Sequence, residues 1–345
     1  MIWLTWRQFR AAAAATAAAL AALAAVLAIT GPGLADDYAT GLTGCTTQSD
    51  GCSRFLQNFF HDNQAAFLGL TAVMLALPAL TGLFWGAPMI TRELEAGTHR
   101  LVWNQSITRT RWLAIKLGLT GLAAMAAAGL ASLAVSWWSG PIDKAAAANE
   151  PGFPRMGTLL FDVRGIVPIG YAAFAFVLGV TVGMLVRRTL PAMAITLAVF
   201  AAVQVAMPLL VRPYLRPPVH ATVEISMSNL EGLGFERGGG PLRLQLRTLA
   251  PDKNGWALSS RLVDTSGNTV SSTVPVSTTS GPCAPDPARG PSACFAELKR
   301  LGYRQEVSYH PSSRFWAFQR TETGIYTILA LGLAGFCFRR LRRVS

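Results

Sequence analysis

Long runs of apolar residues alternate with shorter polar segments along most of this 345-residue chain. A helix rises 1.5 Å per residue, so a run of about 20 apolar residues can cross a hydrocarbon core of about 30 Å. The pattern predicts six transmembrane helices, at residues 11–30, 65–90, 117–138, 166–186, 190–211 and 324–338. The last of these runs is the shortest, and it would need its flanking arginines or the preceding aromatic residues to reach the membrane interfaces.

Charge supports this interpretation and gives it an orientation. Only 14% of the residues are charged, against about a quarter in soluble domains, while 51% are hydrophobic. The net charge of +12 would suit nucleic acid, yet many arginines stand at the ends of apolar runs: Arg7, Arg10, Arg92, Arg187, Arg188, Arg339, Arg340, Arg342 and Arg343. This is the positive-inside pattern of a membrane protein rather than a basic groove. We expect the chain to lie in a lipid membrane with both termini in the cytoplasm, and to bind no nucleic acid.

The first apolar run allows two interpretations. A basic start, an Ala-rich stretch and the sequence GLADD resemble a cleaved secretory signal. Alternatively, Trp3, Trp6 and Phe9 beside Arg7 and Arg10 form an interfacial helix that leads into a retained span.

Residues 212–320 have the composition of a soluble domain. Apolar and polar residues alternate in segments such as PLRLQLRTLA, and Gly- and Pro-rich clusters separate these segments. A small β-rich extracellular domain between the fifth and sixth spans is predicted; a long disordered loop, above all at 271–291, is the alternative. The domains are then 1–211, with five helices and a cytoplasmic loop at 91–116, followed by 212–320, and finally 321–345 with the sixth helix and a basic tail.

The five cysteines divide according to this topology. Cys45 and Cys52 fall in the first outer loop, Cys283 and Cys294 in the outer domain, and Cys337 near the inner end of the last span. We expect two disulfides and one free thiol, because disulfides persist in oxidising compartments. Each short bridge is worth roughly 2–3 kcal/mol. Metal binding is disfavoured, since neither pair is a C-x-x-C motif and the histidines are scattered.

The chain carries no recognisable energy source. None of its lysines is followed by Ser or Thr, as a phosphate-binding G-x-x-x-x-G-K-[ST] loop requires, and neither G-x-S-x-G nor H-E-x-x-H occurs. The predicted span interiors contain no charged residue, which disfavours an ion relay. Glu322 is expected to form an interfacial pair with Arg320; a gating site is the alternative. Gly179 and Gly183 permit a close helix contact.

The loop between the second and third spans resembles the corresponding segment of type-2 ATP-binding-cassette (ABC) export permeases. It reads ITRELEAGTHRLVWNQSITRTRWLAIK, with acidic residues, a Gly-Thr pair, an apolar stretch, a Ser/Thr-Arg turn and a Lys that opens the next span. Its flanks and the Ala-, Gly- and Arg-rich composition are similar to actinobacterial members. The matching candidate residues are Glu93, Glu95, Gly97, Thr98, Leu101, Val102, Trp103, Arg109, Arg111 and Lys116.

The resemblance implies a coupling helix seated on a separate cytosolic ATPase, with Glu93 and Glu95 orienting it by pairing with nearby arginines. It further implies a permease dimer, expected to consist of two identical chains, in a bacterial plasma membrane. ATP and Mg²⁺ would bind to the partner, and this chain would need no cofactor and catalyse nothing. Uncharged spans weakly favour export of a lipophilic or amphipathic compound. Two alternatives remain open: an interfacial helix that only stabilises the fold, and a non-transporting sensor or assembly protein that binds a ligand through its outer domain.

Overall fold

The computed structural model describes residues 2–45, 51–97, 108–148, 153–234, 241–284 and 291–343. The chain divides into two compact units. The first contains residues 1–153, 158–215 and 316–345 and is helical; the second contains residues 154–157 and 216–315 and holds the strands.

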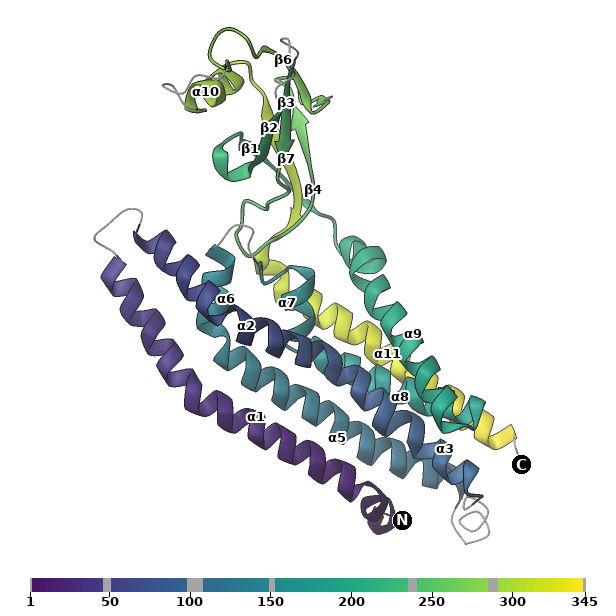
Figure 1. The fold of residues 1–345 in the computed structure, drawn as a ribbon. Helices are drawn as coiled ribbons and strands as arrows, with labels where there is room; N and C mark the ends of the chain where they lie inside the picture. Colours follow the sequence, from purple (N-terminus) through teal and green to yellow (C-terminus); the bar gives the residue numbers. More distant parts are fainter. Residues whose placement is uncertain are drawn as a thin grey trace. The chain divides into compact units, whose positions relative to one another are not determined.

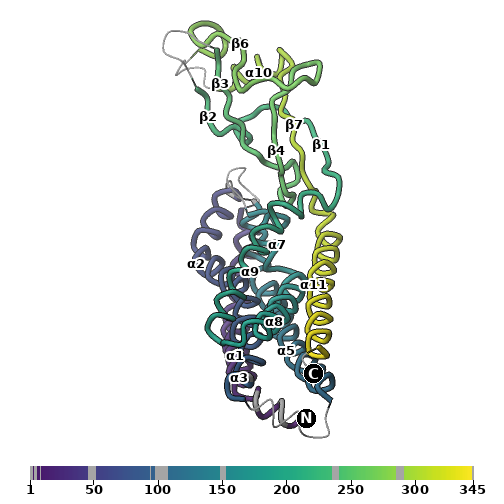
Figure 2. Tube along the Cα trace, turned by 90° about the vertical axis from the view of Figure 1, so that its right-hand side faces the viewer, coloured from purple at the N-terminus to yellow at the C-terminus, as the bar shows by residue number. Residues whose placement is uncertain are grey.

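Helices that run side by side build the first unit, and both chain termini lie at the same end of it (Figures 1 and 2). Short π-helical and 3-10 turns extend α2 and α9. The elements are α1 (Ile2–Cys45), α2 (Gly51–Leu80), η1 (Thr81–Gly86), α3 (Ala87–Glu95), α5 (Arg109–Trp138), α6 (Gly140–Ala148), α7 (Thr158–Val163), α8 (Val167–Val186), α9 (Thr189–Ala206), η2 (Met207–Val211), η3 (Arg212–Tyr214) and α11 (Phe315–Arg343).

Six of these helical segments within the described residues are long and apolar enough to cross a membrane. Large apolar side chains lie exposed on their outer faces; Leu190 is 79% exposed and Leu133 is 70% exposed. Such faces are stable where lipid replaces water. The chain is therefore a multi-pass membrane protein, as predicted. The sixth segment is longer than the sequence indicated, because the helical stretch Ser312–Arg343 is continuous.

Helix α8 is the most enclosed of the six segments, and small residues set its distance from α2 and α3. A Cβ at Gly179 would lie 2.4 Å from the carbonyl oxygen of Gly82, and a Cβ at Gly183 would lie 2.8 Å from that of Ala87. Both distances are shorter than any real Cβ contact. The expected close helix contact at Gly179 and Gly183 is therefore present, because only glycine lets the backbones approach this far.

Within the described residues, apolar cores lie near opposite ends of the helical unit. One includes Leu27, Phe67 and Trp138 of α1, α2 and α5. The other includes Trp112 of α5 and Cys337 of α11. The Cys337 thiol is free and buried, 3.2 Å from Thr181 Oγ1.

The second unit contains two antiparallel sheets, with strand orders β1-β7-β4-β5 and β2-β3-β6. Its other described elements are the short turns η4 and η5 and the short helix α10. The bounds are β1 (Val219–Glu224), η4 (Met227–Asn229), β2 (Leu230–Gly234), β3 (Pro241–Leu246), β4 (Trp256–Val263), β5 (Thr269–Val270), β6 (Thr273–Ser277), α10 (Ser292–Arg300), β7 (Arg304–His310) and η5 (Ser312–Arg314).

This β unit has its own core, in which Leu242, Val274 and Leu298 are fully buried beside the disulfide Cys283–Cys294. A disordered loop is therefore wrong for most of this region. Within 271–291, strand β6 is formed, while residues 285–290 lie outside the described residues. A second disulfide, Cys45–Cys52, joins the end of α1 to the start of α2. Both expected cysteine pairs are therefore disulfide-bonded.

Candidate functional site

The loop that sequence analysis singled out is described only at its two ends. Thr98, Leu101, Val102 and Trp103 lie outside the described residues. Helix α3 ends at Glu95, and Gly97 follows with φ of +66°, a conformation that glycine adopts without steric cost.

Helix α5 begins at Arg109, where the chain emerges from the loop. The Thr108 side chain accepts a hydrogen bond from the backbone N–H of Arg111 and so caps the first turn. Arg109 and Arg111 both lie in this turn, and Arg111 is exposed.

An ion pair joins the two ends of the loop. Lys116 Nζ of α5 donates to Glu93 Oε1 of α3, and the side chains are 4% and 12% exposed. The ammonium also lies 4.9 Å from the centre of the Trp112 ring. A charged hydrogen bond that is shielded from water is stronger than a surface pair, and breaking it strands a buried charge. The pair therefore fixes where the loop leaves one helix and enters the next.

Glu95 ties the same end of α3 to α9. It accepts hydrogen bonds from both the backbone N–H and the hydroxyl of Thr189, each at 2.8 Å. Thr189 opens α9, so the carboxylate satisfies donors at a helix N-terminus. These two hydrogen bonds, the backbone one first, lower the pKa of Glu95 below its usual value.

Glu93 and Glu95 were expected to pair with nearby arginines. The structure gives Glu93 a hydrogen bond from Lys116 and Glu95 hydrogen bonds from Thr189, and the positive charges of Arg188 and Arg92 also act on Glu95. Lys116 and Thr189 belong to neighbouring helices. The acidic residues therefore position α3 against α5 and α9. Of the ten candidate loop residues, the structure brings Glu93 and Lys116 into contact and gives Glu95 a separate anchor.

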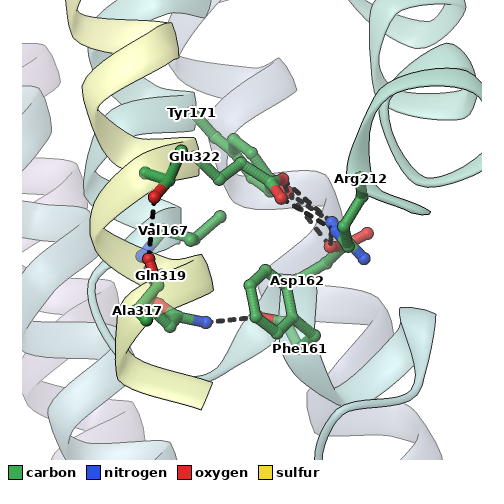
Figure 3. Close-up of polar contacts among 9 residues, drawn as sticks. Phe161, Asp162, Val167, Tyr171, Arg212, Ala317, Gln319 and Glu322 are labelled. Carbon is green, nitrogen blue, oxygen red and sulfur yellow. Dashed lines mark hydrogen bonds and ion pairs between the residues drawn. The ribbon is translucent and has the colours of Figure 1, made fainter. Parts of the chain in front are cut away.

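A second polar cluster lies at the other end of the helical unit, and sequence analysis missed it. Arg212 of η3 is fully buried and reaches Glu322 of α11 through two hydrogen bonds, Nε to Oε2 at 2.8 Å and Nη2 to Oε1 at 2.9 Å. It also donates to Asp162 of α7 and lies over the Phe161 ring, 4.3 Å from its centre. Figure 3 shows these side chains converging from α7, α8, α11 and the end of the fifth span.

Tyr171 of α8 completes the cluster. Its hydroxyl lies 2.6 Å from Glu322 Oε1 and 3.0 Å from Asp162 Oδ1. The expected pair of Glu322 with Arg320 is thus wrong, because Glu322 is fully buried while Arg320 is exposed. The predicted spans themselves contain no charged residue, but the helical segments of the structure extend past them, and Lys116, Arg212 and Glu322 lie buried in these extensions.

Gln319 joins α11 to the same region one turn away. Its Oε1 accepts from the backbone N–H groups of Ile166 and Val167, each at 2.9 Å, and its Nε2 donates to the Phe161 carbonyl at 3.0 Å. The first N–H groups of a helix have no partner within the helix. Gln319 supplies that partner for α8, so α7, α8 and α11 are held together by side chains of α11 (Figure 3).

The family model described as ABC-2 membrane transporter related matches residues 17–212. This match spans more than half of the chain. The chain belongs to this family.

Membership identifies the chain as the membrane component of a transporter, a kind of protein that associates with an ATPase subunit. Such components are generally not catalytic themselves. The match includes the loop between α3 and α5 and ends at Arg212, before the β unit and α11. Comparison with curated proteins and with solved structures returns no match. Among the described residues, no group of three or more His, Cys, Asp or Glu could hold a metal ion.

Proposed function

We propose that this chain is the transmembrane subunit of an ABC exporter in a bacterial plasma membrane. Two copies form the pathway, and a separate cytosolic ATPase supplies ATP and Mg²⁺ binding. The termini are cytoplasmic and the β unit is extracellular. The arginines that flank the spans and the disulfides in α1–α2 and the β unit support this sidedness. The cargo is a lipophilic or amphipathic compound that moves outward.

The observation that carries this proposal is the anchoring of the loop ends. Glu93 and Lys116 join α3 and α5 on either side of residues 94–115, and Glu95 fixes α3 to α9. A loop held in this way can transmit the movement of an attached ATPase to three helices at once. Trp103, inside the loop, is an apolar anchor of the type that dominates protein interfaces.

The experiment measures binding of the cognate ATPase subunit to purified permease. Trp103→Ala should weaken binding by about 1–3 kcal/mol, which is about 5- to 150-fold in Kd. Glu93→Lys and Lys116→Glu should each weaken binding because each places like charges together. The double exchange should restore it, because the pair is re-formed in reverse.

Arg54→Ala is the control, since Arg54 is exposed at the start of α2, at the opposite end of the helical unit from α3. Wild-type affinity in both Trp103→Ala and Glu93→Lys would refute coupling through this loop. A permease that binds no ATPase, yet binds a ligand through its β unit, would instead be a membrane sensor.

A further inference from the structure

A cavity of about 300 Å³ lies beside the Glu93–Lys116 pair. Its walls come from three elements that are distant in sequence: the start of α1, the segment from η1 to α3, and the first turns of α5. The lining residues are Phe9, Ala12, Phe84, Trp85, Pro88, Met89, Arg92, Glu93, Lys116 and Thr120. Its size is at the lower end of the range for small-molecule sites.

Most of the wall is apolar and one side of it faces out of the helical unit. Phe9 of α1 meets Trp85 edge-on, with ring centres 4.7 Å apart. Phe84 is 58% exposed although it lines the cavity. In a bilayer, the surface beside Phe84 faces hydrocarbon chains, so an acyl chain can enter from the side.

The polar part of the wall is positively charged. Arg92 and Lys116 contribute two positive charges and Glu93 one negative charge, and Glu93 is already bound to Lys116. Arg92 is exposed at the cavity. Glu95, the other acid on α3, acts electrostatically on Arg92 and Arg188 but does not line the cavity. An anionic group is therefore the complement of this wall.

The cavity also lies near the level of a membrane interface. Trp3 and Trp6 precede Phe9 on α1 and are 67% and 53% exposed, and the Arg7 guanidinium lies 5.3 Å from the centre of the Trp3 ring. Exposed Trp beside Arg is typical of the headgroup layer. Basic pockets between transmembrane helices on the cytoplasmic side bind acidic lipid headgroups.

We propose that this cavity binds the headgroup end of an acidic phospholipid from the cytoplasmic leaflet. The phosphate contacts Arg92, and the start of an acyl chain lies over Phe84. A lipid in this position touches the ion pair that holds the coupling loop, and so stabilises the arrangement of α3 and α5. The sidedness and the effect on coupling rest on the proposed function, whereas the binding itself does not.

The binding test uses the purified permease alone, in detergent, with phosphatidylglycerol or phosphatidylcholine added. Native mass spectrometry counts the lipids retained. Wild type should retain phosphatidylglycerol in preference to phosphatidylcholine, and Arg92→Gln should reduce that retention about fivefold, as expected for one basic residue. Ala12→Phe, which fills the cavity without changing charge, should reduce it as well.

Arg340→Gln is the matched control, because Arg340 is exposed near the end of α11 and does not line the cavity. This variant should retain lipid as wild type does. Equal retention in wild type, Arg92→Gln and Ala12→Phe, or equal retention of both lipids, would overturn the proposal. Gel filtration of each variant separates loss of binding from loss of fold.

A second arm uses the permease–ATPase complex in nanodiscs. ATPase activity should be higher with phosphatidylglycerol than with phosphatidylcholine in wild type, and this difference should shrink in Arg92→Gln. Preferential retention of phosphatidylglycerol without any associated ATPase would support the site and refute the proposed function. A complex whose activity is indifferent to lipid, formed by a permease without lipid preference, would refute the site alone.

Discussion

Replacing Arg212 by Met should be among the most damaging single changes in the helical unit. Arg212 is fully buried and is the only cation that the structure describes within hydrogen-bond reach of Glu322 and Asp162. Met has a similar length but no charge, so the change strands two carboxylates in a buried site. Breaking a buried ion pair by removing one partner costs about 3–5 kcal/mol.

The assay is unfolding of the purified protein in mixed micelles with increasing sodium dodecyl sulfate, which compares free energies of unfolding between variants. At pH 8 Arg212→Met should lose about 3–5 kcal/mol. The triple variant Asp162→Asn, Arg212→Met, Glu322→Gln should be more stable than Arg212→Met alone, because it leaves no uncompensated charge.

The matched control is Arg320→Met. Arg320 lies two residues before Glu322 but is exposed, so this change should cost less than about 1 kcal/mol. The reasoning fails if Arg212→Met is as stable as wild type at pH 8. It also fails if the triple variant is less stable than Arg212→Met, because the cost would then not arise from stranded charge.

Two further predictions concern packing and the cysteines. Gly179→Ala should destabilise the helical unit by about 1–3 kcal/mol, because the new Cβ would lie 2.4 Å from a backbone oxygen. In the same unfolding assay Gly332→Ala should be neutral, because a Cβ there meets nothing within 4 Å. Equal stability of the two variants would contradict the close contact. Non-reducing peptide mapping should find the Cys283–Cys294 disulfide intact and Cys337 as a free thiol; a disulfide to Cys337 would show that the proposed membrane topology is wrong. Cys283→Ser should destabilise the β unit by roughly 3 kcal/mol.

The sequence by itself determined the class of this protein. Long uncharged runs enter the lipid, where the backbone N–H and C=O groups find hydrogen-bond partners only within the protein, and a helix provides them. The six spans therefore follow from hydropathy alone. Cysteine spacing and sidedness likewise predicted both disulfides. The close contact at Gly179 was visible as a small-residue motif, because the absence of a side chain is itself the signal.

The partners of buried charges were decided by the tertiary structure. Arg212 lies 50 residues from Asp162 and 110 from Glu322, so nothing local in the sequence indicates that they meet. Hydropathy placed Glu322 at an interface because it treats each residue alone, whereas a buried charge is stable when distant helices bring its counter-charge. The same holds for Lys116, which in the sequence stands directly before the third predicted span and in the structure is the partner of Glu93. The pattern of apolar residues is a local property and can be read from the sequence, whereas the pairing of charges depends on which helices pack together.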